Sequence, residues 1–254
     1  MSKPKSKSEL VKHKDDSVSI INKYLDSLIN STEPKQQSKA DKLSYWLKDW
    51  TAFLEYETSF EPTHLRRYKR GEIVKVHLGF NVGSEEGGLH YAVVLDKNNP
   101  KSSAVVTVIP LTSVKPGIDV NNLKSGRIFL GNEIFTKVNS KISTLIKQIN
   151  EQKTFLTSLD DNMPTDVAER IKKLIDDLKL LQRMKSEIQR MKVGSIALVN
   201  QVTTISKIRI YDPKTDSDVL SNVRLSDEKL DLIDKELIST FTGFKHKTID
   251  NNIK

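Results

Sequence analysis

Apolar residues recur along this chain with two periods, and the change of period predicts where strands give way to helices. Three β-branched runs predict a small meander of strands, at residues 73–76, 92–95 and 105–109. Strand character returns at residues 195–199 and 203–210. The apolar positions before, between and after these runs repeat at helical spacing, so the pattern predicts an α+β chain.

Two helices are predicted ahead of the first strand. The apolar residues from Val18 to Ile29 repeat at helical spacing, and the following segment STEPKQQSKADK, which contains Pro34, predicts a linker. A second helix is expected to begin near Ser38 or Asp41 and to carry both tryptophans on one apolar face. That face either packs on the strands or a second subunit, or stacks nucleotide bases, and its helical spacing favours packing.

The segment 136–192 has a helical period in two arms, and the sequence DDNMP at residues 160–164 predicts the turn between them. We expect an antiparallel helical hairpin inserted between two groups of strands. It either docks a partner or a second copy, or covers one face of the strands. A final amphipathic helix is expected over residues 225–241, with Ser226 as its N-cap and no full capping box, because Lys229 takes the place of Glu.

The composition of the chain argues against a membrane protein, a secreted protein and a metal site. No window reaches the ~18 apolar residues of a membrane span, and the lysine-rich start lacks the apolar core of a signal peptide, so we expect a cytoplasmic protein without membrane contact. The chain has no cysteine and five scattered histidines. This composition gives no metal-ligand spacing, so metal-independent chemistry without a cofactor is the expectation.

Charge is distributed unevenly. The net charge is +8, and the basic surplus lies in residues 1–70 and 136–192, whereas the strand-bearing segments balance. Basic surplus favours phosphate-bearing partners, although on helices it is often only a solvated face. The cluster from Arg66 to Arg70 is of more interest because it directly precedes the first strand.

The turn between the first two strands is the candidate site. Gly83, Gly87 and Gly88 permit positive φ angles and a close approach of another backbone, and Ser84 and Glu85 lie among them. An ordinary surface turn of asparagine and lysine joins the second and third strands instead. We therefore assign function to the first turn.

Four short motifs in this region occur in the order typical of one family. They are Arg70-Gly71-Glu72; Gly83-Ser84-Glu85-Glu86-Gly87-Gly88 followed by Ala92-Val93-Val94; Pro110-Leu111-Thr112-Ser113; and Asn200-Gln201-Val202-Thr203-Thr204-Ile205. Together they resemble the PemK/MazF family of toxin endoribonucleases, over roughly residues 70–133 and 193–243.

The resemblance implies a fold and a domain layout. The fold would be a small antiparallel SH3-like β-barrel of the PemK/CcdB type, within an α+β architecture. An N-terminal helical extension would occupy residues 1–67, the barrel residues 68–135 and 193–245, and the hairpin residues 136–192. Because barrel motifs lie on both sides of the hairpin, we expect the hairpin to be separable from the chemistry.

The resemblance also implies a function. Proteins of this family cleave single-stranded RNA, chiefly mRNA, without metal, through attack by the substrate's own 2′-hydroxyl, which leaves a 2′,3′-cyclic phosphate. The expected protein inhibits translation until a cognate antitoxin neutralises it, forms a homodimer, and contacts DNA only through the antitoxin complex. The hairpin would then be a dimerisation or antitoxin-docking arm.

Site residues follow by position from the family's motifs. His90, Thr112 and Glu85 are the expected catalytic residues. The expected RNA-binding residues are Ser84, Ser113, Asn81, Tyr91, Gln201 and Arg70, although hydrogen bonding within a dimer explains Gln201 equally well, and Tyr91 either stacks a base or packs.

Two departures from the family pattern stand out. His90-Tyr91 replaces the usual Arg-Pro, and Leu198-Val199-Asn200 replaces the Arg-x-Asp of some members. A histidine exchanges a proton near neutral pH and an arginine does not, so these departures concentrate the acid–base role on His90.

Three other interpretations stay open: a catalytically dead homologue, a CcdB-like inhibitor that acts by binding alone, and an inert phage-defence or regulatory scaffold. The Ser-Glu loop together with Thr112 and Ser113 favours the enzyme.

Overall fold

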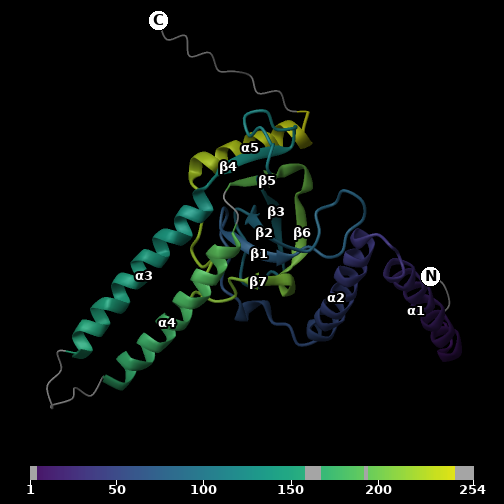
Figure 1. The fold of residues 1–254 in the computed structure, drawn as a ribbon, viewed down its shortest axis with the longest axis horizontal. Coiled ribbons are helices and arrows are strands. Elements are labelled where there is room, and N and C mark those ends of the chain that lie inside the picture. The colour runs from purple at the N-terminus through teal and green to yellow at the C-terminus, as the bar shows by residue number, and fades with distance from the viewer. Residues whose placement is uncertain (1–4, 158–166, 192–193, 244–254) are drawn as a thin grey trace, which may run out of the picture. The chain divides into compact units, whose positions relative to one another are not determined.

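The computed structural model describes residues 5–157, 167–191 and 194–243, and it divides into two compact units between Thr58 and Ser59 (Figure 1). The first unit holds α1 (Lys7–Ile29) and α2 (Pro34–Glu57), which pack on each other. Ser6 caps α1, and its hydroxyl and the side chain of Glu9 form a capping box.

The linker predicted between these two helices is wrong over most of its length. α2 begins at Pro34, several residues before the predicted start at Ser38 or Asp41. A proline is well tolerated in the first turn of a helix, where its missing N–H has no intrahelical acceptor and its φ is already helical. Pro34, expected to break the helical pattern, is instead the first residue of α2.

Seven antiparallel strands form the centre of the second unit. They are β1 (Ile73–His77), β2 (Leu89–Val94), β3 (Val105–Ser113), β4 (Arg127–Gly131), β5 (Ser195–Leu198), β6 (Thr203–Ser206) and β7 (Ile210–Asp212). The order is β4-β5-β3-β2-β1-β7, with β6 paired to β3. Mixed helices and antiparallel strands confirm the α+β class. Among the described residues no pairing joins β4 to β7, so the expected closed barrel is an open sheet, and its SH3-like detail stays a prediction.

The strand β3 holds this sheet together. Its first half pairs with β6, its middle pairs with β2, and its end, from Leu111 to Ser113, pairs with β5. The predicted strand over 203–210 is interrupted by a 3-10 turn, Lys207–Arg209, which separates β6 from β7. β4 was not predicted, because its five residues carry a single short apolar run between glycines.

Both faces of the sheet are buried, which explains why its strands show apolar runs in place of strict alternation. Val74, Val76 and Ala92 point into one apolar cluster, which also contains Tyr68. The strand residues that alternate with these, such as Ile73 and Val93, belong to a second apolar cluster. That cluster also contains residues of the helices. The sheet is therefore a central layer with apolar packing on each side.

Three helices belong to this second unit: α3 (Glu133–Thr157), α4 (Val167–Arg190) and α5 (Asp227–Phe241). α3 and α4 contact each other and lie side by side, as expected for the hairpin, which begins slightly earlier than predicted (Figure 1). The predicted turn at residues 160–164 lies outside the described residues. Ser226 caps α5 by accepting a hydrogen bond from the backbone N–H of Lys229, as predicted.

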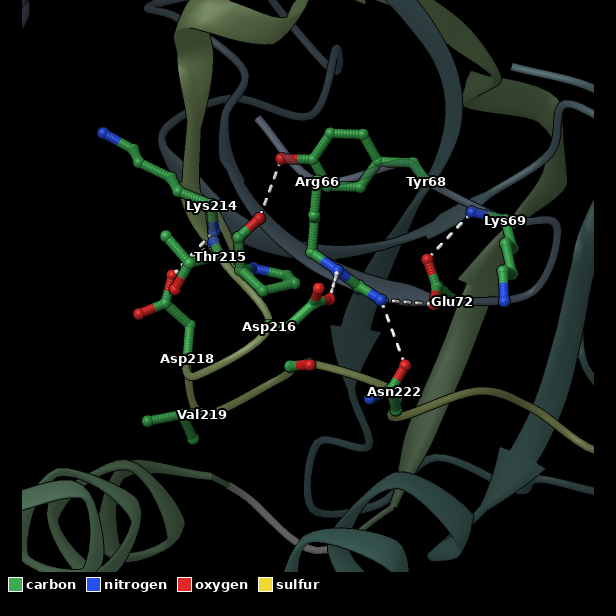
Figure 2. Close-up of polar contacts among 12 residues, drawn as sticks. Arg66, Tyr68, Lys69, Glu72, Lys214, Thr215, Asp216, Asp218, Val219 and Asn222 are labelled. Carbon is green, nitrogen blue, oxygen red and sulfur yellow. Dashed lines mark hydrogen bonds and ion pairs between the residues drawn. The ribbon is translucent and has the colours of Figure 1, made fainter. Parts of the chain in front are cut away.

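A buried guanidinium ties the segment before β1 to the loop after β7 (Figure 2). Arg66 is 7% exposed, and its Nη2 lies 3.0 Å from Glu72 Oε1 and 3.1 Å from Asn222 Oδ1, while its Nε lies 2.9 Å from Asp216. The other carboxylate oxygen of Glu72 accepts the backbone N–H of Lys69 at 2.8 Å. The buried charges of Arg66 and Glu72 thus neutralise each other, which offsets the free-energy cost of removing them from water.

The same loop is held from two further sides. The hydroxyl of Tyr68 donates to the carbonyl of Pro213 at 2.8 Å (Figure 2). From α3, the ammonium of Lys141 donates to the carbonyls of Asp218, Val219 and Ser221 at 2.9 to 3.1 Å, and burial lowers the pKa of this lysine. The loop is therefore rigidly placed although it has no regular secondary structure.

Removing one partner of the buried pair should be costly. We expect Glu72→Ala to lower the free energy of unfolding by about 3–5 kcal/mol, because it removes the buried carboxylate partner of Arg66 and leaves the guanidinium with only the exposed Asp216 as an ionic partner. Urea denaturation followed by circular dichroism measures the loss. Arg67→Ala is the matched control: Arg67 is exposed, its side chain bonds only Asn98 within the described structure, and its removal should cost under about 0.5 kcal/mol. Equal losses in the two variants would contradict the assignment.

Candidate functional site

The turn between β1 and β2 is closed by backbone hydrogen bonds at its base. Leu78 donates to the carbonyl of Gly88 at 2.7 Å, and Gly88 donates to the carbonyl of Gly79 at 2.7 Å. Gly79 and Gly88 both have positive φ, and a Cβ on Gly87 would lie 2.9 Å from the carbonyl oxygen of Gly79. The glycines are thus required by the narrow neck of this loop.

The tip of the loop is held by amide side chains. Gln201 donates from Nε2 to the carbonyl of Ser84 at 3.1 Å, and its Oε1 accepts the backbone N–H of Glu86 at 2.5 Å. Asn81 donates to the carbonyl of Glu86 at 2.7 Å, and the carboxylate of Glu85 accepts the N–H of Val82 at 3.2 Å. Gln201 therefore has a role within its own chain, in ordering the loop.

His90 joins this loop to the end of β3. Its Nδ1 lies 3.1 Å from the carbonyl oxygen of Leu111, and its Nε2 lies 3.1 Å from the carboxylate of Glu86. Both partners are acceptors, so both contacts are hydrogen bonds when both ring nitrogens carry a proton. The carboxylate beside His90 thus belongs to Glu86 and not to its neighbour Glu85, which the motif predicts as catalytic.

A pocket of about 190 Å³ opens next to His90. Thr112 and Ser113 line it from the end of β3, and Tyr91 lines it from β2. The register of β3 against β5 places Thr112 opposite Ile196 and Ser113 opposite Ser195. The structure therefore gathers four of the predicted site residues, His90, Tyr91, Thr112 and Ser113, around one small cavity.

Glu187 of α4 contacts two of the residues that line this pocket. The carboxylate of Glu187 accepts a hydrogen bond from the Tyr91 hydroxyl and lies 2.6 Å from the ammonium of Lys75. Burial acts to raise the pKa of Glu187, but the hydrogen bonds from Lys75 and Tyr91 outweigh it and lower the pKa. Burial and the bond to Glu187 raise the pKa of Tyr91. Tyr91 is thus anchored to α4.

A second, larger pocket of about 680 Å³ is lined by Glu86 and by other residues of the loop. Asn81, Ser84, Glu85 and Gln201 line it, and so does Arg209. Arg209 donates to the carbonyl of His77 at 2.7 Å, and burial lowers its pKa. The sequence reasoning missed Arg209, since no motif marks it and its place depends on a strand end 132 residues away.

Arg70 alone among the predicted residues is not brought to either pocket. Its guanidinium bonds the carbonyl of Leu95 and the carboxylate of Asp234 on α5. The predicted residues thus divide into a group around His90, a group around the loop, and Arg70 apart from both.

The described part of the chain contains no cluster of three or more side chains suited to a metal ion. Among the same residues, no helix is long and apolar enough to cross a membrane.

Comparison with known proteins supports the resemblance seen in the motifs. Residues 69–175 match the model of the PemK-like, MazF-like toxins of type II toxin-antitoxin systems. The matched segment contains Glu86, His90, Thr112 and Ser113, whereas Gln201 lies beyond it. No curated protein matches the chain. Over residues 69–175 the chain is therefore similar to the PemK-like, MazF-like toxins of type II toxin-antitoxin systems.

Proposed function

We propose that this protein is the toxin of a toxin-antitoxin pair and acts as an endoribonuclease on single-stranded RNA. The observation that carries the proposal is the contact between His90 and Glu86, 3.1 Å long, beside the hydroxyls of Thr112 and Ser113. An acid–base pair next to hydroxyl donors is what cleavage of a phosphodiester without metal requires.

The reaction needs one proton acceptor and one proton donor. The 2′-oxygen of the substrate attacks the adjacent phosphorus, so a bond forms from the 2′-oxygen to phosphorus and the bond from phosphorus to the 5′-oxygen breaks. The 2′-hydroxyl loses its proton, and the departing 5′-oxygen gains one. The products are a 2′,3′-cyclic phosphate and a 5′-hydroxyl, and no protein nucleophile takes part.

The pair supplies both functions. With a proton on each ring nitrogen, His90 would be the donor to the 5′-oxygen, and the Glu86 carboxylate would be the acceptor for the 2′ proton. Among the described residues neither Thr112 nor Ser113 has a hydroxyl hydrogen bond to protein. Both hydroxyls therefore have a donor to offer the phosphoryl oxygens.

The larger pocket is the proposed binding site for nucleotides next to the cleaved bond. Ser84 and Glu85 are exposed at its rim, and Arg209 adds a half-buried cation. In this proposal Asn81 and Gln201 order the loop and present it to the RNA, and Glu85 contacts nucleotides without transferring a proton. Tyr91 offers its ring, since its hydroxyl is bound to Glu187, and Arg70 plays a structural role against α5.

The cellular role follows from the family. Cleavage of mRNA would stop translation until a cognate antitoxin neutralises the toxin. We also propose a homodimer, as the resemblance implies. A CcdB-like inhibitor that only binds its target is the principal alternative.

Purified protein should cut a defined single-stranded RNA in the presence of EDTA. The expected products carry a 2′,3′-cyclic phosphate and a 5′-hydroxyl, because the substrate's own hydroxyl is the nucleophile. Treatment of the products with a phosphatase and a 5′-kinase, followed by mass spectrometry, identifies the ends. Products with a 5′-phosphate that form only with added magnesium would overturn the mechanism, and RNA left intact under all conditions would favour the binding-only inhibitor.

Replacing either His90 or Glu86 should remove one side of the dependence of the cleavage rate on pH. The donor must be protonated, so activity falls as pH rises, and the acceptor must be ionised, so activity falls as pH drops. His90→Ala should lose roughly a hundredfold in kcat together with the alkaline limb, and Glu86→Gln should lose a similar factor together with the acid limb. Steady-state rates across pH measure both effects.

Two neighbouring variants sharpen this test. Glu85→Gln should lose much less activity than Glu86→Gln, because the Glu85 carboxylate accepts the N–H of Val82 whereas the Glu86 carboxylate contacts His90. Thr112→Val should slow cleavage without moving the pH profile, since a hydroxyl does not titrate in this range. If Glu85→Gln is the more damaging change, the acceptor is Glu85 and our assignment is wrong.

A further inference from the structure

Two cations line the pocket beside His90, and only one of them is committed to an ion pair. Lys75 of β1 lies 2.6 Å from the Glu187 carboxylate, and both side chains are mostly buried, at 19% and 13% exposure. The ammonium also lies 5.6 Å from the centre of the Tyr91 ring. Lys75 is thus part of the anchor of α4, and its charge is largely neutralised there.

The second cation is Arg190, at the last helical position of α4. Its side chain is exposed, and no carboxylate of the described residues forms an ion pair with it. It lies close enough to Tyr91 and Glu187 for its positive charge to act on both groups. An uncommitted guanidinium therefore borders the same cavity as His90, Thr112 and Ser113.

We propose that Arg190 binds the scissile phosphate in this pocket and stabilises the negative charge that develops on its oxygens. This inference rests on the proposed endoribonuclease function and adds a catalytic residue to it. A guanidinium suits the task because its planar fork donates two hydrogen bonds to two phosphoryl oxygens at once. β2 itself offers no permanent cation here, since position 90 is a histidine.

The proposal changes the expected role of the hairpin. From the sequence we expected the hairpin to be separable from the chemistry. In the structure α4 brings Arg190 to the pocket and Glu187 to Lys75 and Tyr91. Removing the hairpin would therefore remove a catalytic cation as well as the anchor of two pocket residues.

Turnover by Arg190→Ala provides the first test. We expect kcat to fall by roughly a hundredfold, the scale of losing one preorganised donor to a developing oxyanion, with both limbs of the pH profile unmoved. Arg190→Lys should recover part of the rate, because it restores the charge without the fork. Arg183→Ala is the matched control on the same helix, where Arg183 pairs with Asp218 at 3.5 Å, and it should keep the parental rate.

Binding provides the second test and does not require cleavage. A 2′-O-methyl RNA oligonucleotide lacks the nucleophile, so its affinity can be measured by fluorescence anisotropy across salt concentrations. Arg190→Ala should weaken binding and make the slope of log K against log salt shallower by about 0.7, the value for one lost contact to a single strand. Adding His90→Arg to Arg190→Ala should restore binding and the slope, although not turnover.

The outcomes separate the two proposals. If the parent cleaves RNA and Arg190→Ala matches it in rate, affinity and salt slope, the role of Arg190 is overturned while the function stands. If the parent does not cleave RNA, the proposed function fails, and the salt slope of Arg190→Ala alone decides whether the pocket binds phosphate through Arg190. Equal losses in Arg183→Ala and Arg190→Ala would indicate a general effect of helix charge and would also overturn the proposal.

Discussion

The pairing of β3 with three other strands is the constraint on which the second unit depends. A nine-residue strand that meets β6, β2 and β5 in turn fixes the positions of those three, and β1 and β4 then pair with β2 and β5. Its last residues carry the site, because the Leu111 carbonyl orients the His90 ring and the next two positions supply hydroxyls. The chemistry proposed here thus uses groups whose placement the sheet has already determined, which is the preorganisation that catalysis requires.

The sequence predicted most of the strands and the two helical arms of the hairpin, because both depend on local apolar period, whereas β4 was missed. It predicted the site only in part. The motif Arg70-Gly71-Glu72 pointed to the right strand, yet Glu72 bonds the buried Arg66, a role that a motif does not reveal. The choice between Glu85 and Glu86 depends on which carboxylate faces β2, and Arg190 depends on how α4 returns to the sheet. Arg190 lies 100 residues after His90, and proximity over such a separation leaves no local pattern in the sequence.

The hairpin has two kinds of contact with the rest of the unit. Apolar residues of α3 and α4 join the core cluster beneath the sheet, and buried Met184 is one of them. Charged groups then set the register: Glu187 meets Lys75 and Tyr91, and Lys141 meets three loop carbonyls. Burial of apolar surface supplies most of the free energy that holds the helices against the sheet. The buried polar contacts select one register, because they would be broken if a helix moved by one turn.

The Gln201 clamp has a consequence for synthesis of the protein. The loop at Ser84 and Glu86 is closed by a side chain made more than a hundred residues later. A nascent chain halted within the hairpin already contains the whole family-matched segment, but it lacks β5, β6 and the amide that orders the loop. The ribosome must therefore translate the chain as far as Gln201 before the loop can take this shape, and a fragment that ends at residue 175 would carry three of the four motifs without the amide that orders the loop.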